Sequence, residues 1–118
     1  MEAMKKSNEP LWWAFFGAGG VLSALCLPVL LFLVALAMPL GWIETPSYEA
    51  ARSLVHYPLA RLFLFALISL SLLHWAHRFR FTLYDGLQLK HLESLIVVFC
   101  YGGAIIGSVF TAFVLWQL

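Results

Sequence analysis

The stretch Leu11–Leu40, LWWAFFGAGGVLSALCLPVLLFLVALAMPL, holds thirty consecutive residues without a charged side chain. A helix of this length would span about 45 Å at about 1.5 Å per residue, which exceeds the roughly 30 Å hydrocarbon core of a bilayer. We therefore expect a tilted membrane-spanning helix over about residues 12–39, kinked at Pro28. Trp12 and Trp13, at its start, are typical of the headgroup level of a membrane.

The whole chain has the composition of a membrane protein. Of its 118 residues, 63% are apolar and only 11% are charged, and the mean hydropathy is +0.90, whereas a soluble domain is roughly 45–50% apolar and about 25% charged. Further apolar runs predict spans over about 59–79 and 93–116, so the fold class is an all-α integral membrane protein with three transmembrane helices in one domain, 1–118. Cys26 and Cys100 lie in these apolar runs and are expected to be packed core residues. No basic run suggests nucleic-acid binding, and the lipid bilayer is the expected surrounding.

Two more polar segments connect the predicted spans. In the first, Thr45-Pro46 is a turn signal and Ser47 is a suitable N-cap for a short helix at the membrane surface. In the second, residues 78–93, the pair Asp85-Gly86 is the turn signal, and the conformation of 80–93 is left open.

The distribution of Lys and Arg predicts an orientation. Three spans put the two chain ends on opposite sides of the membrane, and the cations divide five against two between those sides. The five lie near the N-terminus and in the second loop: Lys5, Lys6, Arg78, Arg80 and Lys90. The two on the other side are Arg52 and Arg61. Because cytoplasmic loops carry the excess of positive charge, we expect the N-terminus in the cytoplasm and the C-terminus outside.

The segment His74–Arg80, HWAHRFR, ends the second span with two histidines and two arginines. Titratable and cationic groups at a bilayer boundary are costly unless they bind something. A routine interpretation is an aromatic belt with an orienting charge. The functional interpretation is a quinone pocket in which Trp13 and Arg78 donate hydrogen bonds to the carbonyl oxygens, while His77 exchanges protons. His74 is a weaker candidate for a haem ligand, since the first span has no histidine and a partner chain would have to supply the second ligand.

Small residues mark two close-approach surfaces. Gly17, one turn deeper than Trp13 on the same helix face, belongs to the run Gly17-Ala18-Gly19-Gly20, which suits a neighbouring helix or a flat ligand. Gly103 and Gly107 form a stripe on the third span that favours close helix packing. No catalytic residue and no further metal site is predicted, and the lack of an ionisable residue at mid-membrane argues against a transporter or channel.

The sequence EPLWWAFFGAGG at residues 9–20 resembles the amino-terminal signature of the fumarate reductase D-subunit family, the small hydrophobic anchors of quinol:fumarate reductase. The resemblance covers nearly the whole chain in length, hydropathy and span order, and it continues through Pro28, Pro39-Leu40-Gly41, His77-Arg78 and Asp85.

This resemblance implies a membrane anchor that is not catalytic alone. It would pair in the bacterial inner membrane with a second, C-type anchor subunit, and the two would hold an iron–sulfur subunit and a flavoprotein subunit for fumarate reduction in anaerobic respiration. It implies a shared menaquinone site in which Trp13 and Arg78 match pocket residues of the family, with Gly17 and His77 at neighbouring positions. The acid that handles quinol protons would belong to the C-type subunit, and we expect no carboxylate within the spans of this chain.

The chain also departs from the family pattern. One member of the family is rich in histidine after His77-Arg78, where this chain holds Phe79, Arg80, Phe81 and Tyr84. Leu73-His74-Trp75 followed by Tyr84-Asp85 is similar to the haem-bearing anchor of succinate dehydrogenase. Two alternatives therefore stay open: a haem b-containing anchor of that type, and a purely structural anchor without quinone contact.

Overall fold

The structure is a computed structural model that describes residues 8–118, so Lys5 and Lys6, two of the cations that predict the orientation, lie outside the described part. The described chain is helical, in the order α1 (Glu9–Phe32), the π-helical turn η1 (Leu33–Ala37), α2 (Tyr48–His56), α3 (Pro58–Gly86), the 3-10 turn η2 (Lys90–Leu92) and α4 (Glu93–Gln117). Three segments between residues 8 and 118 are long and apolar enough to cross a membrane: Glu9–Ala37, Pro58–Gly86 and Lys90–Gln117. The predicted three-helix membrane fold is confirmed at this level.

The first span begins earlier than predicted, because Pro10 occupies the first turn of α1, where its missing N–H costs nothing. Pro28 lies inside α1 and removes one intrahelical hydrogen bond there. The span ends after η1, where the N–H of Trp42 donates to the carbonyl oxygen of Ala37 at 2.9 Å. Gly41 adopts φ of 74°, a left-handed conformation that glycine reaches without strain.

The short surface helix predicted after Ser47 is confirmed as α2. The Ser47 side chain accepts a hydrogen bond from the backbone N–H of Ala50 at 3.2 Å, which satisfies one of the free donors at the helix start. Arg52 Nε donates to the carbonyl oxygen of Leu118 at 3.2 Å, so α2 lies against the end of α4.

Helix α3 is longer than the second span predicted from the sequence. The sequence predicts an end near residue 79 and a loop over 78–93, but α3 continues to Gly86. Charged residues can end a membrane span without ending a helix. Here Arg80 has a hydrogen-bond partner on the next turn of the same helix, because its Nε donates to the Tyr84 hydroxyl at 3.0 Å. The turn comes after Gly86, at Gln88, which has φ of 52°.

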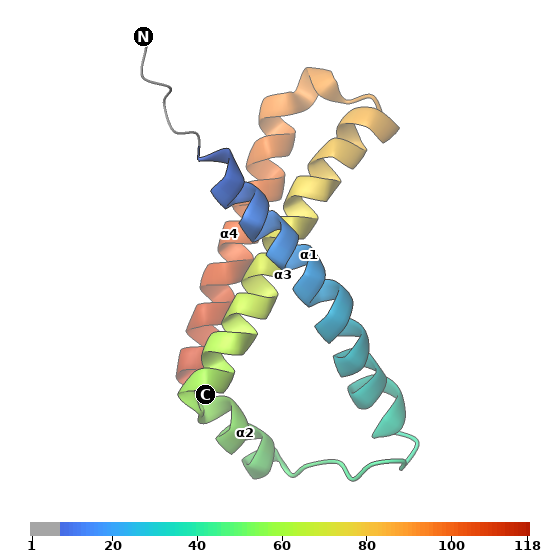
Figure 1. Ribbon diagram of the computed structural model, residues 1–118, viewed down its shortest axis with the longest axis vertical. Helices are drawn as coiled ribbons and strands as arrows, with labels where there is room; N and C mark the ends of the chain where they lie inside the picture. Colours follow the sequence, from blue (N-terminus) through green and yellow to red (C-terminus); the bar gives the residue numbers. More distant parts are fainter. Residues whose placement is uncertain (1–7) are drawn as a thin grey trace.

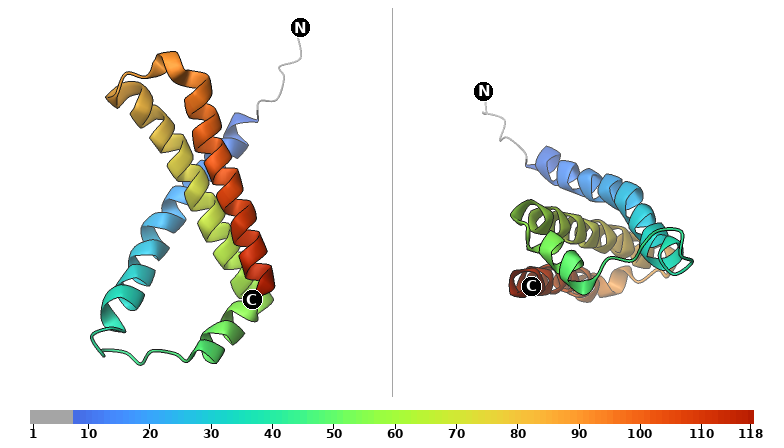
Figure 2. Two further views of the ribbon diagram at one scale, coloured as in Figure 1. Left: turned by 180° about the vertical axis from the view of Figure 1, so that it is seen from behind. Right: turned by 90° about the horizontal axis from the view of Figure 1, so that it is seen from below.

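Helix α3 lies in the middle of the bundle, with α1 crossing one side and α4 packed along the other (Figures 1 and 2). The buried core lies between α3 and α4 and consists of Ala76, Tyr84, Ile96, Cys100 and Ala104. Cys100 is fully buried, as predicted, and Cys26 is half-buried; both are free thiols.

Small residues allow α1 to cross α3 closely. A Cβ added at Gly19 would lie inside van der Waals contact with the carbonyl oxygen of Leu70 and 2.9 Å from its carbonyl carbon. One turn away, Ser23 Oγ lies 2.6 Å from Ser71 Oγ, and it also donates to the carbonyl oxygen of Gly19. Polar contacts therefore fix the crossing point in an otherwise apolar interface, where such bonds are worth about 0.6 kcal/mol each.

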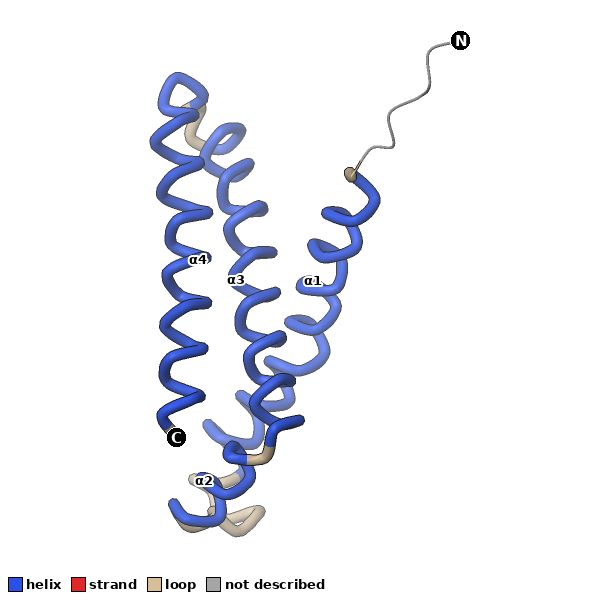
Figure 3. The backbone as a smooth tube through the Cα atoms, turned by 90° about the vertical axis from the view of Figure 1, so that its left-hand side faces the viewer, coloured by secondary structure: helices blue, strands red, loops and turns tan. Residues whose placement is uncertain are grey.

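The start of α1 and the connection between α3 and α4 lie at one end of the molecule, whereas α2 and Leu118 lie at the other (Figures 1 and 3). Trp12 and Trp13 of α1 line the same cavity as His77 of α3, so they lie beside the His77-Arg78 pair, as the topology predicted.

Candidate functional site

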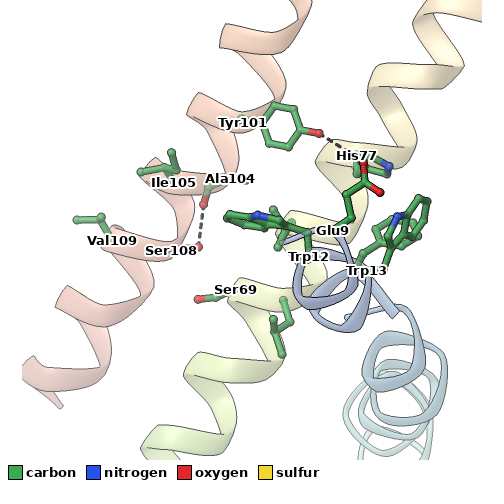
Figure 4. A pocket seen from close by; sticks show the side chains of 13 residues that line it. Glu9, Trp12, Trp13, Ser69, His77, Tyr101, Ala104, Ile105, Ser108 and Val109 are labelled. Atoms are coloured by element: carbon green, nitrogen blue, oxygen red, sulfur yellow. Dashed lines mark hydrogen bonds between the residues drawn. The ribbon is translucent and has the colours of Figure 1, made fainter. Parts of the chain in front are cut away.

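A cavity of about 770 Å³ lies between the first turns of α1 and the middle parts of α3 and α4 (Figure 4). Its volume falls in the roughly 300–1,000 Å³ range of small-molecule sites. Its walls come from three helices: Glu9, Trp12, Trp13 and Phe16 of α1, Ser69, Leu70, Leu73 and His77 of α3, and Tyr101, Ala104, Ile105, Ser108 and Val109 of α4. Helix α3 packs against both α1 and α4, so the cavity lies between α1 and α4 with α3 as its third wall.

One end of the cavity is polar. Each helix contributes one group there, namely Glu9, His77 and Tyr101 (Figure 4). His77 Nδ1 lies 3.0 Å from the Tyr101 hydroxyl oxygen, a hydrogen bond that joins α3 to α4. A carboxyl, an imidazole and a phenol at one end of an apolar slot are suited to hold a polar head group, and the carboxyl and the imidazole can exchange its protons.

The imidazole of His77 is enclosed by aromatic rings. Its centroid lies 6.0 Å from that of Trp13 at an interplanar angle of 81°, and 4.7 Å from that of Phe16 at 65°. Edge-to-face pairs of this kind add about 0.5–1.5 kcal/mol beyond simple burial. The contacts limit the directions that the imidazole can take and give the cavity an aromatic wall.

The deeper end of the cavity is mostly apolar. Ser108 Oγ donates to the carbonyl oxygen of Ala104 within its own helix at 2.8 Å. Ser69 Oγ is buried and has no hydrogen-bond partner among residues 8–118. This apolar part of the cavity suits a hydrocarbon chain that continues from a polar head group.

The guanidinium group of Arg80 lies over the ring of Tyr101, which lines the cavity. The Arg80 Cζ atom lies 5.9 Å from the centre of the Tyr101 ring and 5.4 Å from that of Tyr84. On its other side Arg80 Nη2 is 3.7 Å from Glu93 Oε1, an ion pair between α3 and the start of α4. Tyr101 is therefore held between the imidazole of His77 and a paired cation.

Known proteins resemble this chain over most of its length. A family model described as the D subunit of fumarate reductase matches residues 3–116. The chain belongs to the fumarate reductase D-subunit family. The fumarate reductase D subunit of Mycobacterium tuberculosis H37Rv is 45% identical over 104 residues, which cover 88% of this chain and 83% of the relative. The proteins of the same name from Vibrio cholerae and Aliivibrio fischeri are 36% identical (88% of this chain, 80% of the relative) and 31% identical (97% and 95%).

Family membership makes the chain a multi-pass membrane-anchor subunit of fumarate reductase, which works in a complex with the other fumarate reductase subunits. The resemblance recognised in residues 9–20 is thereby confirmed.

The structure brings together two of the four residues predicted for the quinone site of this chain. Trp13 and His77 both line the cavity and face one another. Arg78 is exposed and is not among the lining residues, because neighbouring helix residues point about 100° apart and His77 takes the direction of the cavity. Gly17 is also exposed, with open space where a Cβ would be, and it too lies outside the lining. The roles of Arg78 and Gly17 stay predictions.

Two titratable cavity residues were missed. The sequence places Glu9 in a polar arm before the first span, yet it is the first residue of α1 and lines the cavity. The sequence signal for this earlier helix start was Pro10, because proline is favoured in the first turn of a helix. Tyr101 was missed because hydrophobicity alone predicted the third span; a phenol hydroxyl in an apolar run was the available signal.

His74 has a structural place between α1 and α3. Its Nδ1 lies 3.0 Å from the carbonyl oxygen of Phe16, so Nδ1–H donates to it, and the two rings stack at 4.4 Å with an interplanar angle of 19°. Gly20 makes room for the imidazole, since an added Cβ would lie 2.7 Å from its Cε1. These contacts give His74 a packing role at the contact between α1 and α3. Within residues 8–118 no group of three or more His, Cys, Asp or Glu side chains could hold a metal ion.

Proposed function

We propose that the cavity is the contribution of this chain to a menaquinol site in quinol:fumarate reductase. The observation that carries the proposal is the placement of Glu9, His77 and Tyr101, one from each spanning helix, at the polar end of an otherwise apolar slot. A quinol has this same division, with a polar aromatic head and an isoprenoid tail. The rings of Trp13 and Phe16 provide aromatic surfaces against which such a head can pack.

The chemistry at this end is proton transfer. Oxidation of a quinol to a quinone breaks two O–H bonds and releases two protons and two electrons. In the proposed site His77 Nε2 accepts one proton and the Glu9 carboxylate accepts the other. The two electrons leave for the iron–sulfur subunit and reach fumarate in the flavoprotein subunit, so this chain is not catalytic alone.

Arg78 and Gly17 lie outside the cavity lining, and we propose that they act where a C-type anchor subunit extends the site. Arg78 is exposed at the same end of α3 as His77, so its guanidinium is available to a neighbouring subunit or to a head group held between the two chains. Gly17 is open on its Cβ side and would let a flat ligand or a helix approach α1.

The orientation that fits this function places one end of the bundle, with the start of α1 and the connection between α3 and α4, at the cytoplasmic face of the bacterial inner membrane. We call this end of the bundle the cavity end. Among residues 8–118, the cavity end carries Arg78, Arg80 and Lys90, and the opposite end carries Arg52 and Arg61. The excess of cations at the cavity end favours the cytoplasm, where the iron–sulfur and flavoprotein subunits would dock. The N-terminus would then lie in the cytoplasm and the C-terminus outside.

Replacement of the aromatic wall tests the proposal. Trp13→Ala in the assembled complex should raise KM for a short-chain naphthoquinol about tenfold, the effect of losing an aromatic contact worth about 1.4 kcal/mol. Fumarate reduction with an artificial soluble electron donor should be unchanged, because that route bypasses the membrane subunits.

The matched control is Trp116→Ala, which removes an exposed tryptophan at the opposite end of the bundle and should leave both activities unchanged. Unchanged quinol kinetics in Trp13→Ala would instead favour the purely structural anchor. An equal loss of both activities would assign Trp13 to assembly.

A further inference from the structure

Tyr101 brings a phenol hydroxyl from α4 to the polar end of the cavity, 3.0 Å from His77 Nδ1. Both side chains are half-buried and both line the cavity. The bond occupies Nδ1, so Nε2 is the ring nitrogen that Tyr101 does not engage. The two residues come from different helices, and their bond therefore depends on how α3 and α4 pack.

We propose that Tyr101 is a positioning residue for His77: its hydroxyl oxygen accepts a hydrogen bond from Nδ1–H and so fixes the imidazole with Nε2 as the acceptor of the quinol proton. The inference rests on the proposed quinol site and adds to it a residue of α4 that has no direct part in the proton transfer.

The proposal includes the tautomer. A phenol hydroxyl can donate or accept, so the 3.0 Å contact fits either neutral form of the imidazole, and the proposed form is the one with its proton on Nδ1. With Nδ1–H donating to Tyr101, Nε2 holds a lone pair and can take a proton from a quinol hydroxyl, whose O–H bond breaks as the Nε2–H bond forms. The resulting imidazolium still donates from Nδ1 to the same oxygen, so the bond serves the state before and the state after the transfer.

The hydrogen bond selects the ring orientation. The edge-to-face contacts of His77 with Trp13 and Phe16 restrict the ring plane. They do not distinguish the two orientations related by a 180° flip, which exchange nitrogen and carbon positions. A hydrogen bond to Nδ1 does distinguish them, because a carbon at that position offers Tyr101 no comparable donor.

Tyr101 is itself held in place. The Arg80 guanidinium lies over its ring at 5.9 Å and is paired with Glu93 on the same helix as Tyr101. A cation over an aromatic face is stabilised by the ring quadrupole, so Arg80 helps to hold the phenol ring. A fixed phenol can in turn fix the imidazole.

A double-mutant cycle in the assembled complex tests the inference, with a short-chain naphthoquinol as the substrate. Tyr101→Phe keeps the ring and removes only the hydroxyl. It should lower kcat of quinol-linked fumarate reduction roughly two- to tenfold, the range for a single lost hydrogen bond, with KM little changed because the cavity wall is kept. His77→Leu should lower kcat about a hundredfold or more. In the His77→Leu background Tyr101→Phe should have no further effect, since there is no imidazole left to position.

The matched control is Tyr57→Phe, which removes the phenol hydroxyl of an exposed tyrosine at the start of α3, outside the cavity lining, and should leave kcat unchanged. Turnover with a soluble artificial donor checks that each variant assembles, and His77→Gln replaces His77→Leu if the latter does not. If His77→Leu impairs quinol oxidation and Tyr101→Phe does not, or if Tyr101→Phe lowers kcat equally in both backgrounds, the positioning role is wrong and the quinol site stands. If neither variant changes quinol kinetics, the proposed site fails and the inference fails with it.

Discussion

The crossing of α1 over α3 makes a quantitative prediction about Gly19. In Gly19→Ala the new Cβ would lie inside van der Waals contact with the carbonyl oxygen of Leu70 and 2.9 Å from its carbonyl carbon. These are backbone atoms of a helix and cannot rotate away, so α1 has to move. Overpacking of this kind costs about 1–3 kcal/mol.

The same substitution also has a favourable term, because alanine is a better helix former than glycine by about 0.5–1 kcal/mol. The control Gly102→Ala isolates the steric term. Gly102 lies inside α4, and nothing comes within 4 Å of a Cβ added there. The propensity gain is common to both variants, so the difference in stability between them should be the overpacking energy alone, about 1–3 kcal/mol.

The measurement is an SDS titration of the purified complex, followed by release of this chain, together with KM for a naphthoquinol. Gly19→Ala should release the chain at lower SDS than Gly102→Ala does. It should also raise KM, because α1 carries the Trp12 and Trp13 wall of the cavity. Equal behaviour of the two alanine variants would show that α1 and α3 do not approach at Gly19, and the cavity described between them would lose its support.

Three other variants address separate parts of the molecule. Glu9→Gln removes one proposed proton acceptor and should lower quinol-linked kcat about tenfold or more while artificial-donor turnover stays constant; an unchanged kcat would restrict proton transfer to other groups. His74→Ala should lower the SDS midpoint of the complex, because the α1–α3 contact loses a hydrogen bond and a ring stack. The visible absorption spectrum should be unchanged. Loss of a reduced b-type band would make His74 a haem ligand instead. Gly107→Ile should destabilise this chain, since a Cβ there already lies 2.8 Å from Leu72 Cδ1. Gly103→Ile places its side chain in open space and should weaken only the pairing with the second anchor subunit, which co-purification would show. Equal effects of the two variants would contradict the packing of α3 on α4.

The sequence predicted the fold because membrane spans are specified by composition. The uncharged run 11–40 and the N-cap at Ser47 led directly to α1 and α2, since each depends on local rules of length and hydrogen bonding. Helix α3 continues beyond the predicted second span because Arg78 and Arg80 end the apolar run without ending the helix. The backbone hydrogen bonds continue beyond that boundary to Gly86.

The site was predicted only in part, because it depends on the rotation of each helix about its axis. Topology alone places Trp13 and His77 at the same end, and they do meet. It does not decide between His77 and Arg78, which are adjacent in sequence and point in different directions. Tyr101 reaches His77 only because α4 presents that face to α3, and this is a property of the packing between the helices.

The position of Pro28 has a consequence for how the protein tolerates different membranes. The crossing contacts of α1 are made by Gly19 and Ser23, and the cavity wall lies on the N-terminal side of them. Pro28 and the π-helical turn Leu33–Ala37 lie on the other side, where the hydrogen-bond ladder is weakest. A change in lipid acyl-chain length can therefore be absorbed by bending the distal half of α1, while the half that forms the cavity stays fixed to α3. Quinol affinity should then vary little among lipids of different chain length, even though the span that carries the aromatic wall is much longer than the bilayer is thick.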